Sequence, residues 1–245
     1  MNVTNERHFH ITIAEHIVDV FTLYPRTYPL CEGYICEGTA DITAYMSRKS
    51  IEYEKSHCET RPMPKDDYLE TLAVNRSISE SLLSYATFLM HGAVIALDSQ
   101  TSFMFTAKSG TGKTTHIRKW LENAPGAFVV NGDKPLIKIA GEEAIAYGTP
   151  WCGKEHLNTN IGVPLRAIVL MERGEDNEIE EISFSQAFPT LLQQTYRPAD
   201  ADKMRKTLSL LSALNGKMKF YRFRFNNLKP DAFRVSYEAL TGKHI

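Results

Sequence analysis

The stretch that decides the fold runs from residue 107 to residue 115 and reads Ala-Lys-Ser-Gly-Thr-Gly-Lys-Thr-Thr. Its second half matches the end of the phosphate-binding P-loop pattern G-x-x-x-x-G-K-[ST], with Gly112, Lys113 and Thr114 in the last three places. A glycine turn that opens a helix aims backbone N–H groups and the positive end of the helix at phosphate oxygens. One place departs from the pattern, because Ala107 stands where the first glycine is expected.

The residues on either side supply the context that this motif needs. Residues 102–106 form a short, apolar, β-prone run, and residues 115–121 are compatible with a helix. Strand, glycine turn and helix in this order are the setting in which a P-loop works. The residues predicted to bind a nucleotide are Lys108, Ser109, Gly110, Thr111, Gly112, Lys113, Thr114 and Thr115. Lys113 is expected to reach the outer phosphates, and the Thr114 hydroxyl is expected to face Mg²⁺.

A carboxylate is expected at the end of the next strand, which residues 127–131 form. Asp133 lies in the turn-rich segment Asn-Gly-Asp-Lys-Pro at residues 131–135. Ligands of open α/β sheets bind at the carboxyl ends of the strands, and phosphoryl transfer needs a carboxylate for Mg²⁺ or for the acceptor hydroxyl. Asp133 is therefore predicted to hold the metal together with Thr114. The alternative is an ordinary turn aspartate.

Residues 147–156 form a glycine-containing irregular segment that holds Trp151, one of two tryptophans in the chain. Loops of this kind carry function more often than cores do. In a functional loop Trp151 would wall a pocket and Lys154 would clamp an anion, whereas in a structural loop Trp151 would pack in the core. Lys154, Arg166 and Arg197 are candidates for stabilising a transferring phosphoryl group, with surface ion pairs as the alternative.

The first part of the chain has the pattern of a β-rich region. Alternating runs predict strands at residues 9–13, 18–23, 40–45 and 50–53, and a helix is predicted from 66 to 85. We place a domain boundary there, with a β-rich N-terminal region at 1–65 and a nucleotide-binding domain at 66–245. His8, His10 and His16 have no matching carboxylate pattern, so they are interpreted as surface or packing residues. The four cysteines, Cys31, Cys36, Cys58 and Cys152, are interpreted as reduced structural thiols.

Beyond the glycine-rich stretch, the pattern predicts strands and helices in mixed order. Strands are expected at residues 93–97, 127–131, 136–140, 144–147, 165–172, 179–182 and 218–225, and helices at residues 183–194, 200–215 and 230–240. The strand at 93–97 and the strand at 102–106 are expected to form a tight hairpin directly before the glycine turn.

Charge and hydropathy exclude several classes of protein. The 245 residues carry 28 Lys and Arg against 29 Asp and Glu, so no electrostatic nucleic-acid binder is indicated. No run of 18 apolar residues is present and the first residues lack the apolar core of a signal peptide, so we expect no membrane association and a cytoplasmic location.

Four segments together resemble the HPr kinase and phosphoenolpyruvate carboxykinase superfamily. They are residues 91–97, which begin His-Gly, residues 109–115, Asp133, and the Thr-Pro-Trp-Cys-Gly-Lys loop at residues 149–154. The resemblance implies an α/β fold with a mixed β-sheet, a P-loop and flanking helices. It also implies that Lys113 and Thr114 hold ATP phosphates and Mg²⁺, and that His91 lies near the transferred phosphoryl group. Asp133 matches the second of two adjacent acids in the family, and Gly132 stands in place of the first.

The catalytic residues predicted in this way are Lys113, Asp133 and His91, with ATP and Mg²⁺ as cofactors. The leading interpretation is a kinase that phosphorylates a hydroxyl on a peptide, a protein or a small molecule. One alternative is a nucleotide-binding regulator or chaperone in a peptide-modification pathway, which Gly132 favours. Another is an NTPase that has no acceptor. GTP or pyrophosphate in place of ATP, and a homo-oligomeric state, are left open.

Overall fold

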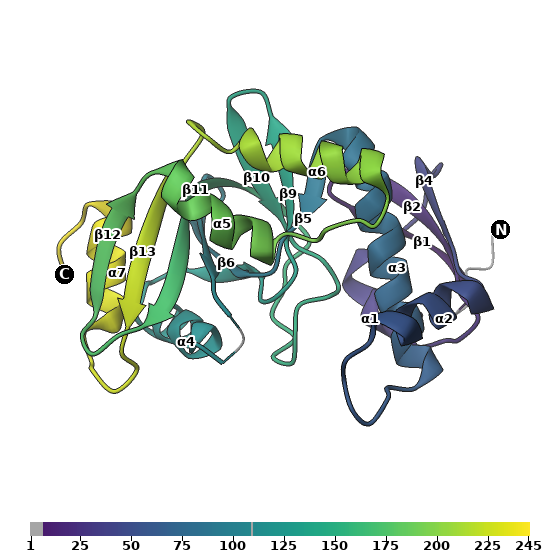
Figure 1. Cartoon of the computed structure of the whole chain (residues 1–245), viewed down its shortest axis with the longest axis horizontal. Coiled ribbons are helices and arrows are strands. Elements are labelled where there is room, and N and C mark those ends of the chain that lie inside the picture. Colours follow the sequence, from purple (N-terminus) through teal and green to yellow (C-terminus); the bar gives the residue numbers. More distant parts are fainter. Residues whose placement is uncertain (1–6, 109) are drawn as a thin grey trace. The chain divides into compact units, whose positions relative to one another are not determined.

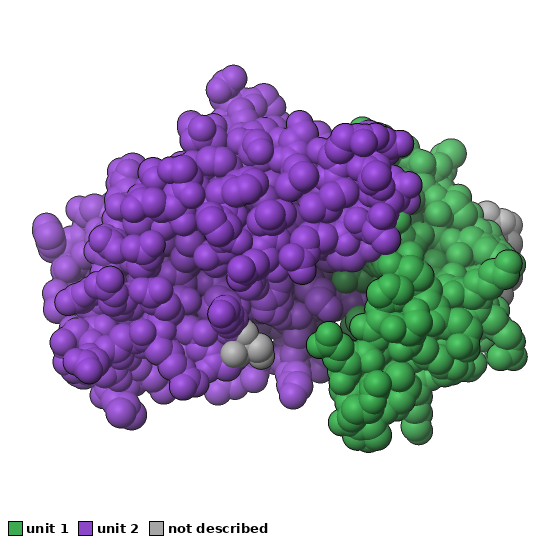
Figure 2. Space-filling view, viewed as in Figure 1, with its two compact units in different colours: residues 1–85 green, residues 86–245 purple. Residues whose placement is uncertain are grey.

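The protein divides into two compact units, Met1–Tyr85 and Ala86–Ile245 (Figure 2). The structure is a computed structural model and describes residues 7–108 and 110–245. The boundary expected after residue 65 falls earlier than this division. Helix α3 (Asp66–Leu82) lies between the two positions, and it packs on α2 (Arg48–His57) and β4 (Ile42–Tyr45) of the first unit.

The first unit contains a four-stranded sheet of order β3-β1-β2-β4 with helices packed on it (Figure 1). Its remaining elements are β1 (His8–Ile13), β2 (His16–Phe21), α1 (Thr27–Leu30), η1 (Glu32–Tyr34), β3 (Ile35–Cys36) and η2 (Leu83–Tyr85). The prediction of a strand at residues 50–53 is wrong, because this segment lies inside α2. Ser47 and Ser50 cap the helix reciprocally, with each side chain accepting a hydrogen bond from the other residue's backbone N–H.

The β1–β2 hairpin has a two-residue turn that fixes its register. Ala14 and Glu15 both have positive φ, 48° and 70°, as the tight hairpin turns that match strand twist require. Ile13 is paired with His16 across the turn, and His10 with Asp19 further along. Because side chains alternate along a strand, β1 buries Phe9, Ile11 and Ile13 on one face and leaves His8 and His10 on the other.

The second unit is built on a curled mixed sheet (Figure 1). Its strands are β5 (Thr87–Leu89), β6 (Ala93–Asp98), β7 (Thr101–Thr106), β8 (Phe128–Asn131), β9 (Leu136–Ala140), β10 (Glu143–Tyr147), β11 (Gly162–Arg173), β12 (Glu178–Ile182) and β13 (Lys219–Phe225). Its helices are α4 (Lys113–Asn123), α5 (Phe184–Gln194), α6 (Ala201–Ser212) and α7 (Ala232–Thr241). The strands and helices predicted for this part of the chain are confirmed to within a few residues, including the β6–β7 hairpin.

Strand β7 lies parallel to β11, and β11 lies parallel to β13, while the other pairings in the second unit are antiparallel. Thr106 at the end of β7 is in register with Leu170 of β11. The carboxyl ends of these strands therefore meet at one edge of the sheet. This is the edge where an open α/β sheet binds its ligands.

Helices cover both faces of this sheet. On one face, α4 and α7 join Phe103, Phe105 and Phe223 of the strands in a single buried core. On the other face, α5 buries Leu191 and packs Phe184 against Phe220 of β13, with ring centroids 5.4 Å apart and planes tilted by 58°. None of the helices in the described ranges is long and apolar enough to cross a membrane.

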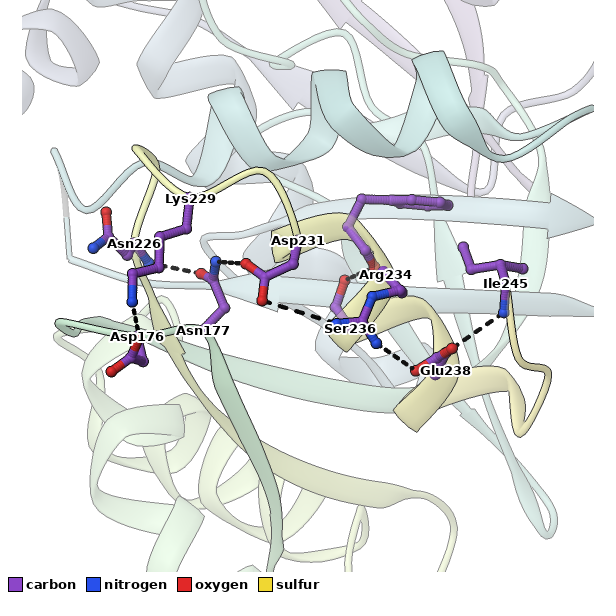
Figure 3. A network of polar contacts seen from close by, with 10 residues as sticks. Asp176, Asn177, Asn226, Lys229, Asp231, Arg234, Ser236, Glu238 and Ile245 are labelled. Atoms are coloured by element: carbon purple, nitrogen blue, oxygen red, sulfur yellow. Dashed lines mark hydrogen bonds and ion pairs between the residues drawn. The ribbon is translucent and has the colours of Figure 1, made fainter.

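A polar network holds the start of α7 to the loops beside it (Figure 3). Buried Asn177 donates from Nδ2 to Asp231 Oδ1 at 2.7 Å and accepts from the Asn226 backbone N–H at 2.8 Å. Lys229 pairs with Asp176 next to it, and Arg234 bonds Glu238 one turn along the helix at 3.3 Å. The network fixes α7 against the sheet, and α7 in turn packs on α4.

Candidate functional site

The glycine-rich stretch connects β7 to α4 as a tight loop. Gly110 and Gly112 have φ of 80° and 114°, a region that favours glycine. A Cβ at Gly112 would lie 2.6 Å from Cε1 of Phe225, so no larger residue fits without movement of that ring. Thr111 closes the turn by donating from its backbone and its hydroxyl to the Lys108 carbonyl at 3.3 and 2.9 Å. Ser109, which the sequence also assigned to phosphate binding, lies outside the described residues.

Helix α4 begins at Lys113, directly after this turn. Gly112 occupies the N-cap position, and no side chain from residues 7–108 or 110–245 caps the helix. The backbone N–H groups of its first turn are orphan donors, and together with the helix dipole they favour an anion at this end. Thr114 is exposed on this turn, and Thr115 is partly buried.

Three side chains form a hydrogen-bonded chain at the same edge of the sheet. Lys113 Nζ lies 3.0 Å from His91 Nε2, and His91 Nδ1 lies 3.2 Å from Asp133 Oδ1. A lysine ammonium has only hydrogens to donate, so His91 Nε2 is the acceptor in this contact. His91 Nδ1 is then the donor to Asp133. The structure thus brings together the three residues that the sequence predicted as catalytic.

The backbone holds His91 and Asp133 in place. The Thr106 hydroxyl donates to the His91 carbonyl at 2.7 Å, and the His91 N–H donates to the Gln194 carbonyl at 2.7 Å. The Gly92 N–H donates to the Asp133 carbonyl at 2.9 Å. The end of β7, the start of β6 and the turn after β8 are therefore fastened at one point.

Asp133 owes its position to the turn that follows β8. The fully buried Asn131 accepts from the backbone N–H groups of Asp133 and Lys134 at 2.9 and 2.7 Å. Asn131 also donates to the carbonyl of buried Thr149 at 3.0 Å. This is an Asx-type turn, which fixes the backbone and leaves the Asp133 side chain turned to His91.

Burial and neighbouring charges shift the pKa values at this edge. Burial lowers the pKa of Lys113 to about 8, and the Asp133 charge opposes this only in part. Burial raises the pKa of Asp133, but the hydrogen bond from His91 and the nearby positive charges outweigh it and leave the pKa lowered. At neutral pH the site therefore holds a carboxylate beside a lysine that loses its proton far more easily than usual.

The lowered pKa of Lys113 predicts that phosphate binding takes up a proton in mild alkali. Between the folded pKa of about 8 and the ordinary value of 10.5, Lys113 is mostly neutral in the free protein. A bound phosphate anion favours the ammonium and raises this pKa again. The affinity of this loop for a phosphate-bearing ligand is expected to fall as pH rises above 8. Titration calorimetry at about pH 9 should show a binding enthalpy that depends on the buffer's ionisation enthalpy. A buffer-independent enthalpy, or the same dependence in Lys113→Met, would contradict this.

The loop between β10 and β11 packs directly against the backbone of Gly132. The Gly132 N–H donates to the Leu157 carbonyl at 2.9 Å, and a Cβ at Gly132 would lie 2.7 Å from the Cys152 carbonyl oxygen. Arg118 of α4 holds the same loop through Glu155 at 2.5 Å. Trp151 is buried in it, as the structural interpretation of the loop expected. The backbone of Gly132 thus lies close to the backbone of this loop, and a carboxylate side chain at this position has no room.

Gly132→Asp is expected to destabilise the protein by about 1–3 kcal/mol without raising activity, because the new Cβ overpacks against backbone. Denaturant unfolding followed by tryptophan fluorescence measures this. Leu228→Asp is the control, because it introduces the same side chain in the unit that holds both tryptophans, at a position that is 92% exposed. A Gly132→Asp protein that is both as stable as the original and more active would contradict this prediction, because it would mean that the loop moves to accept the side chain.

The structure separates the three basic residues that the sequence offered as ligands of a transferring phosphoryl group. Arg166 is wrong as a phosphate ligand, because it bonds Glu143 at 2.8 Å and the Gln100 carbonyl at 3.0 Å, at the start of β7 rather than its end. Lys154 and Arg197 are exposed, and a role for them in phosphate binding stays a prediction. The sequence missed Arg173, which ends β11 and donates to the Gly110 carbonyl at 2.8 Å. Its place after an apolar strand was the available signal.

No protein-family model and no curated protein matches the chain. Among solved structures, the chain is similar to the HPr(Ser) kinase/phosphatase from Coxiella burnetii, with a TM-score of 0.37 and 10% sequence identity. The alignment covers 63% of this chain and 88% of that chain. A TM-score this low supports no conclusion about activity.

Proposed function

We propose that the second unit binds Mg²⁺-ATP and transfers a phosphoryl group to a hydroxyl on a peptide, a protein or a small molecule. The observation that carries the proposal is the Lys113–His91–Asp133 chain at the uncapped start of α4. It combines a phosphate-seeking cation, a nitrogen base and a metal-binding carboxylate at the ligand-binding edge of the sheet. Phosphoryl transfer requires such positioning and charge neutralisation more than covalent chemistry.

The residues present fit both cofactors. The first-turn N–H groups of α4 and the side-chain-free Gly112 leave room for phosphate oxygens, and Lys113 neutralises the outer ones. Thr114 and Asp133 offer the hydroxyl and carboxylate oxygens that Mg²⁺ prefers. Bound Mg²⁺ neutralises charge on the phosphates. Arg173 holds the Gly110 carbonyl and keeps the loop in the conformation that presents these groups.

His91 is the base in this proposal. Asp133 holds the Nδ1 proton, so the lone pair is on Nε2, which Lys113 occupies in the absence of nucleotide. When Lys113 turns to the phosphates, Nε2 becomes free to accept the proton of the acceptor hydroxyl. The hydroxyl oxygen then forms the new bond to phosphorus as the bond to the leaving ADP oxygen breaks. This assignment accounts for a site in which Gly132 replaces the first acid.

The test follows phosphorus directly. The full chain is incubated with Mg²⁺-ATP and with panels of serine peptides and small hydroxyl compounds, and ³¹P NMR records ADP, free phosphate and phosphate esters. Esters together with ADP support a kinase, and His91→Ala should remove them while ATP binding remains. Free phosphate in place of esters supports an NTPase.

A nucleotide-binding regulator is the second candidate, and the packed backbone at Gly132 favours it. In that case Mg²⁺-ATP binds with no phosphorus product in any panel. His91→Ala would then change neither the affinity nor the product spectrum.

A further inference from the structure

Two histidines and a carboxylate converge on the outer face of the β1–β2 hairpin, in the first unit. His8 Nε2 lies 2.8 Å from Asp19 Oδ1, and His10 Nε2 lies 3.3 Å from the same oxygen. One ligand atom from each residue lies within 4.8 Å of the other two. The absence of a matching carboxylate, inferred from the sequence, is therefore wrong, because Asp19 reaches the histidines across the hairpin.

The fold dictates this convergence. His8 and His10 are two residues apart on β1 and so share a face, and Asp19 is the register partner of His10 on β2. The opposite face of the same strands is buried, so a slip of the register by one residue would expose the core. The face that carries the three residues is thus fixed by the hydrophobic core of the unit.

The spacing of the ligand atoms suits a tetrahedral metal ion. Zinc bonds of about 2.0–2.2 Å to imidazole nitrogen and carboxylate oxygen place neighbouring ligand atoms about 3.3–3.5 Å apart. The 3.3 Å between His10 Nε2 and Asp19 Oδ1 lies at the lower end of this range, and the 2.8 Å hydrogen bond between His8 Nε2 and Asp19 Oδ1 would lengthen by about 0.5 Å around an ion. The His8 ring is stacked on Phe21, with centroids 4.1 Å apart and planes at 11°, so its orientation is already restricted.

Exposure differs among the three residues in a way that leaves one side open. His10 and Asp19 are each 22% exposed and His8 is 47% exposed. An ion held by the three would therefore keep a position facing solvent, which a water molecule fills, as in zinc sites with three protein ligands.

We propose that His8, His10 and Asp19 form a binding site for Zn²⁺ or a similar borderline divalent transition-metal ion. Each histidine would coordinate through Nε2 as the neutral imidazole that carries its proton on Nδ1, and Asp19 would coordinate through Oδ1 in place of its hydrogen bonds to the two Nε2 atoms. The bound ion cross-links β1 to β2 and stabilises the first unit. Imidazole ligands set this site apart from the oxygen-lined Mg²⁺ site proposed in the second unit.

The experiment uses the full chain without a histidine tag, after treatment with a chelator. Co²⁺ is titrated as a spectroscopic probe and Zn²⁺ is then added in competition, while a thermal melt is recorded with and without Zn²⁺. The expected result is one equivalent of Co²⁺ with a tetrahedral d–d spectrum, displaced by Zn²⁺, and a higher melting temperature with Zn²⁺. His10→Gln and Asp19→Asn should each weaken binding by at least roughly 10- to 100-fold.

Matched variants keep the outcome decisive. His57→Gln removes a histidine of the same unit that lies outside the cluster, and Asp133→Asn removes the carboxylate of the other proposed metal site; both should leave the Co²⁺ spectrum unchanged. His8→Gln changes an exposed residue and tests the site even if the His10 variant misfolds. The proposal is overturned if only octahedral Co²⁺ is seen. It is also overturned if the His8 and Asp19 variants bind Co²⁺ as tightly as the original protein does. A sulfur-to-cobalt charge-transfer band would also overturn it, since it would assign the ion to a thiol such as Cys36, the partner of His10 on β3.

Discussion

Lys113→Met is expected to abolish measurable Mg²⁺-ATP binding and to lower any phosphoryl transfer by roughly 10²–10³-fold. Lys113 is the cation at the start of α4, and methionine keeps its length while it removes the charge. Isothermal titration calorimetry gives the affinity, and product formation gives the rate. Lys119→Met is the matched control, since Lys119 belongs to the same helix but lines the shallow pocket between α4 and α7. Equal ATP affinity in the Lys113 and Lys119 variants would contradict the site.

The same variant is expected to fold at least as well as the original protein. The lowered pKa of Lys113 means that burial of its ammonium costs free energy in the folded state. Removing the charge relieves this cost, so the melting temperature without nucleotide should stay equal or rise at neutral pH. Loss of binding with retained stability is the pattern of a residue kept for function.

Trp120→Ala is expected to lower the free energy of unfolding by about 3–5 kcal/mol. Trp120 is fully buried between the sheet and α7, with its ring centroid 5.7 Å from Phe103 and 5.5 Å from Phe233. Its indole N–H donates to Ser236 Oγ at 3.0 Å, so truncation also leaves a buried hydroxyl without this partner. The variant keeps Trp151 in the same unit, and its fluorescence follows denaturant unfolding of that unit.

Leu228→Ala serves as the control for that measurement, because Leu228 is 92% exposed and its loss should leave stability nearly unchanged. Trp120→Phe should fall between the two, since it keeps most of the packing and loses the hydrogen bond. A loss of less than about 1 kcal/mol in Trp120→Ala would mean that α4 does not depend on this core.

The second unit was largely predictable from sequence because its signals are local. The β7 run, the glycines at 110 and 112 and the apolar face of α4 are close in sequence, and each favours the same strand–turn–helix arrangement. The prediction of a strand at residues 50–53 was wrong because a competing local signal favours a helix there. Its four-residue alternation is too short to outweigh the capping box at Ser47, which starts a helix through it.

Contacts between distant segments were harder to predict. Arg173 reaches the Gly110 carbonyl only because β11 lies parallel to β7, and a parallel pairing of strands so far apart has no local signature. The resemblance assigned Lys113, His91 and Asp133 to one site, and the contacts that link them into a chain came from the structure. Asp19 was missed as a partner of the histidines because the turn at Ala14 and Glu15 lacks the Asn-Gly or Gly residues that mark tight hairpins.

The central claim is that the first turn of α4 and the Lys113–His91–Asp133 chain bind the phosphates of Mg²⁺-ATP. The most direct measurement is nuclear magnetic resonance of isotope-labelled protein during titration with Mg²⁺-ATP. We expect the largest shifts on the backbone amides of residues 110–115 and on the His91 ring, as Lys113 leaves it. Shifts confined to the shallow pocket that Lys119 and Arg234 line, or no shifts at saturating nucleotide, would contradict it.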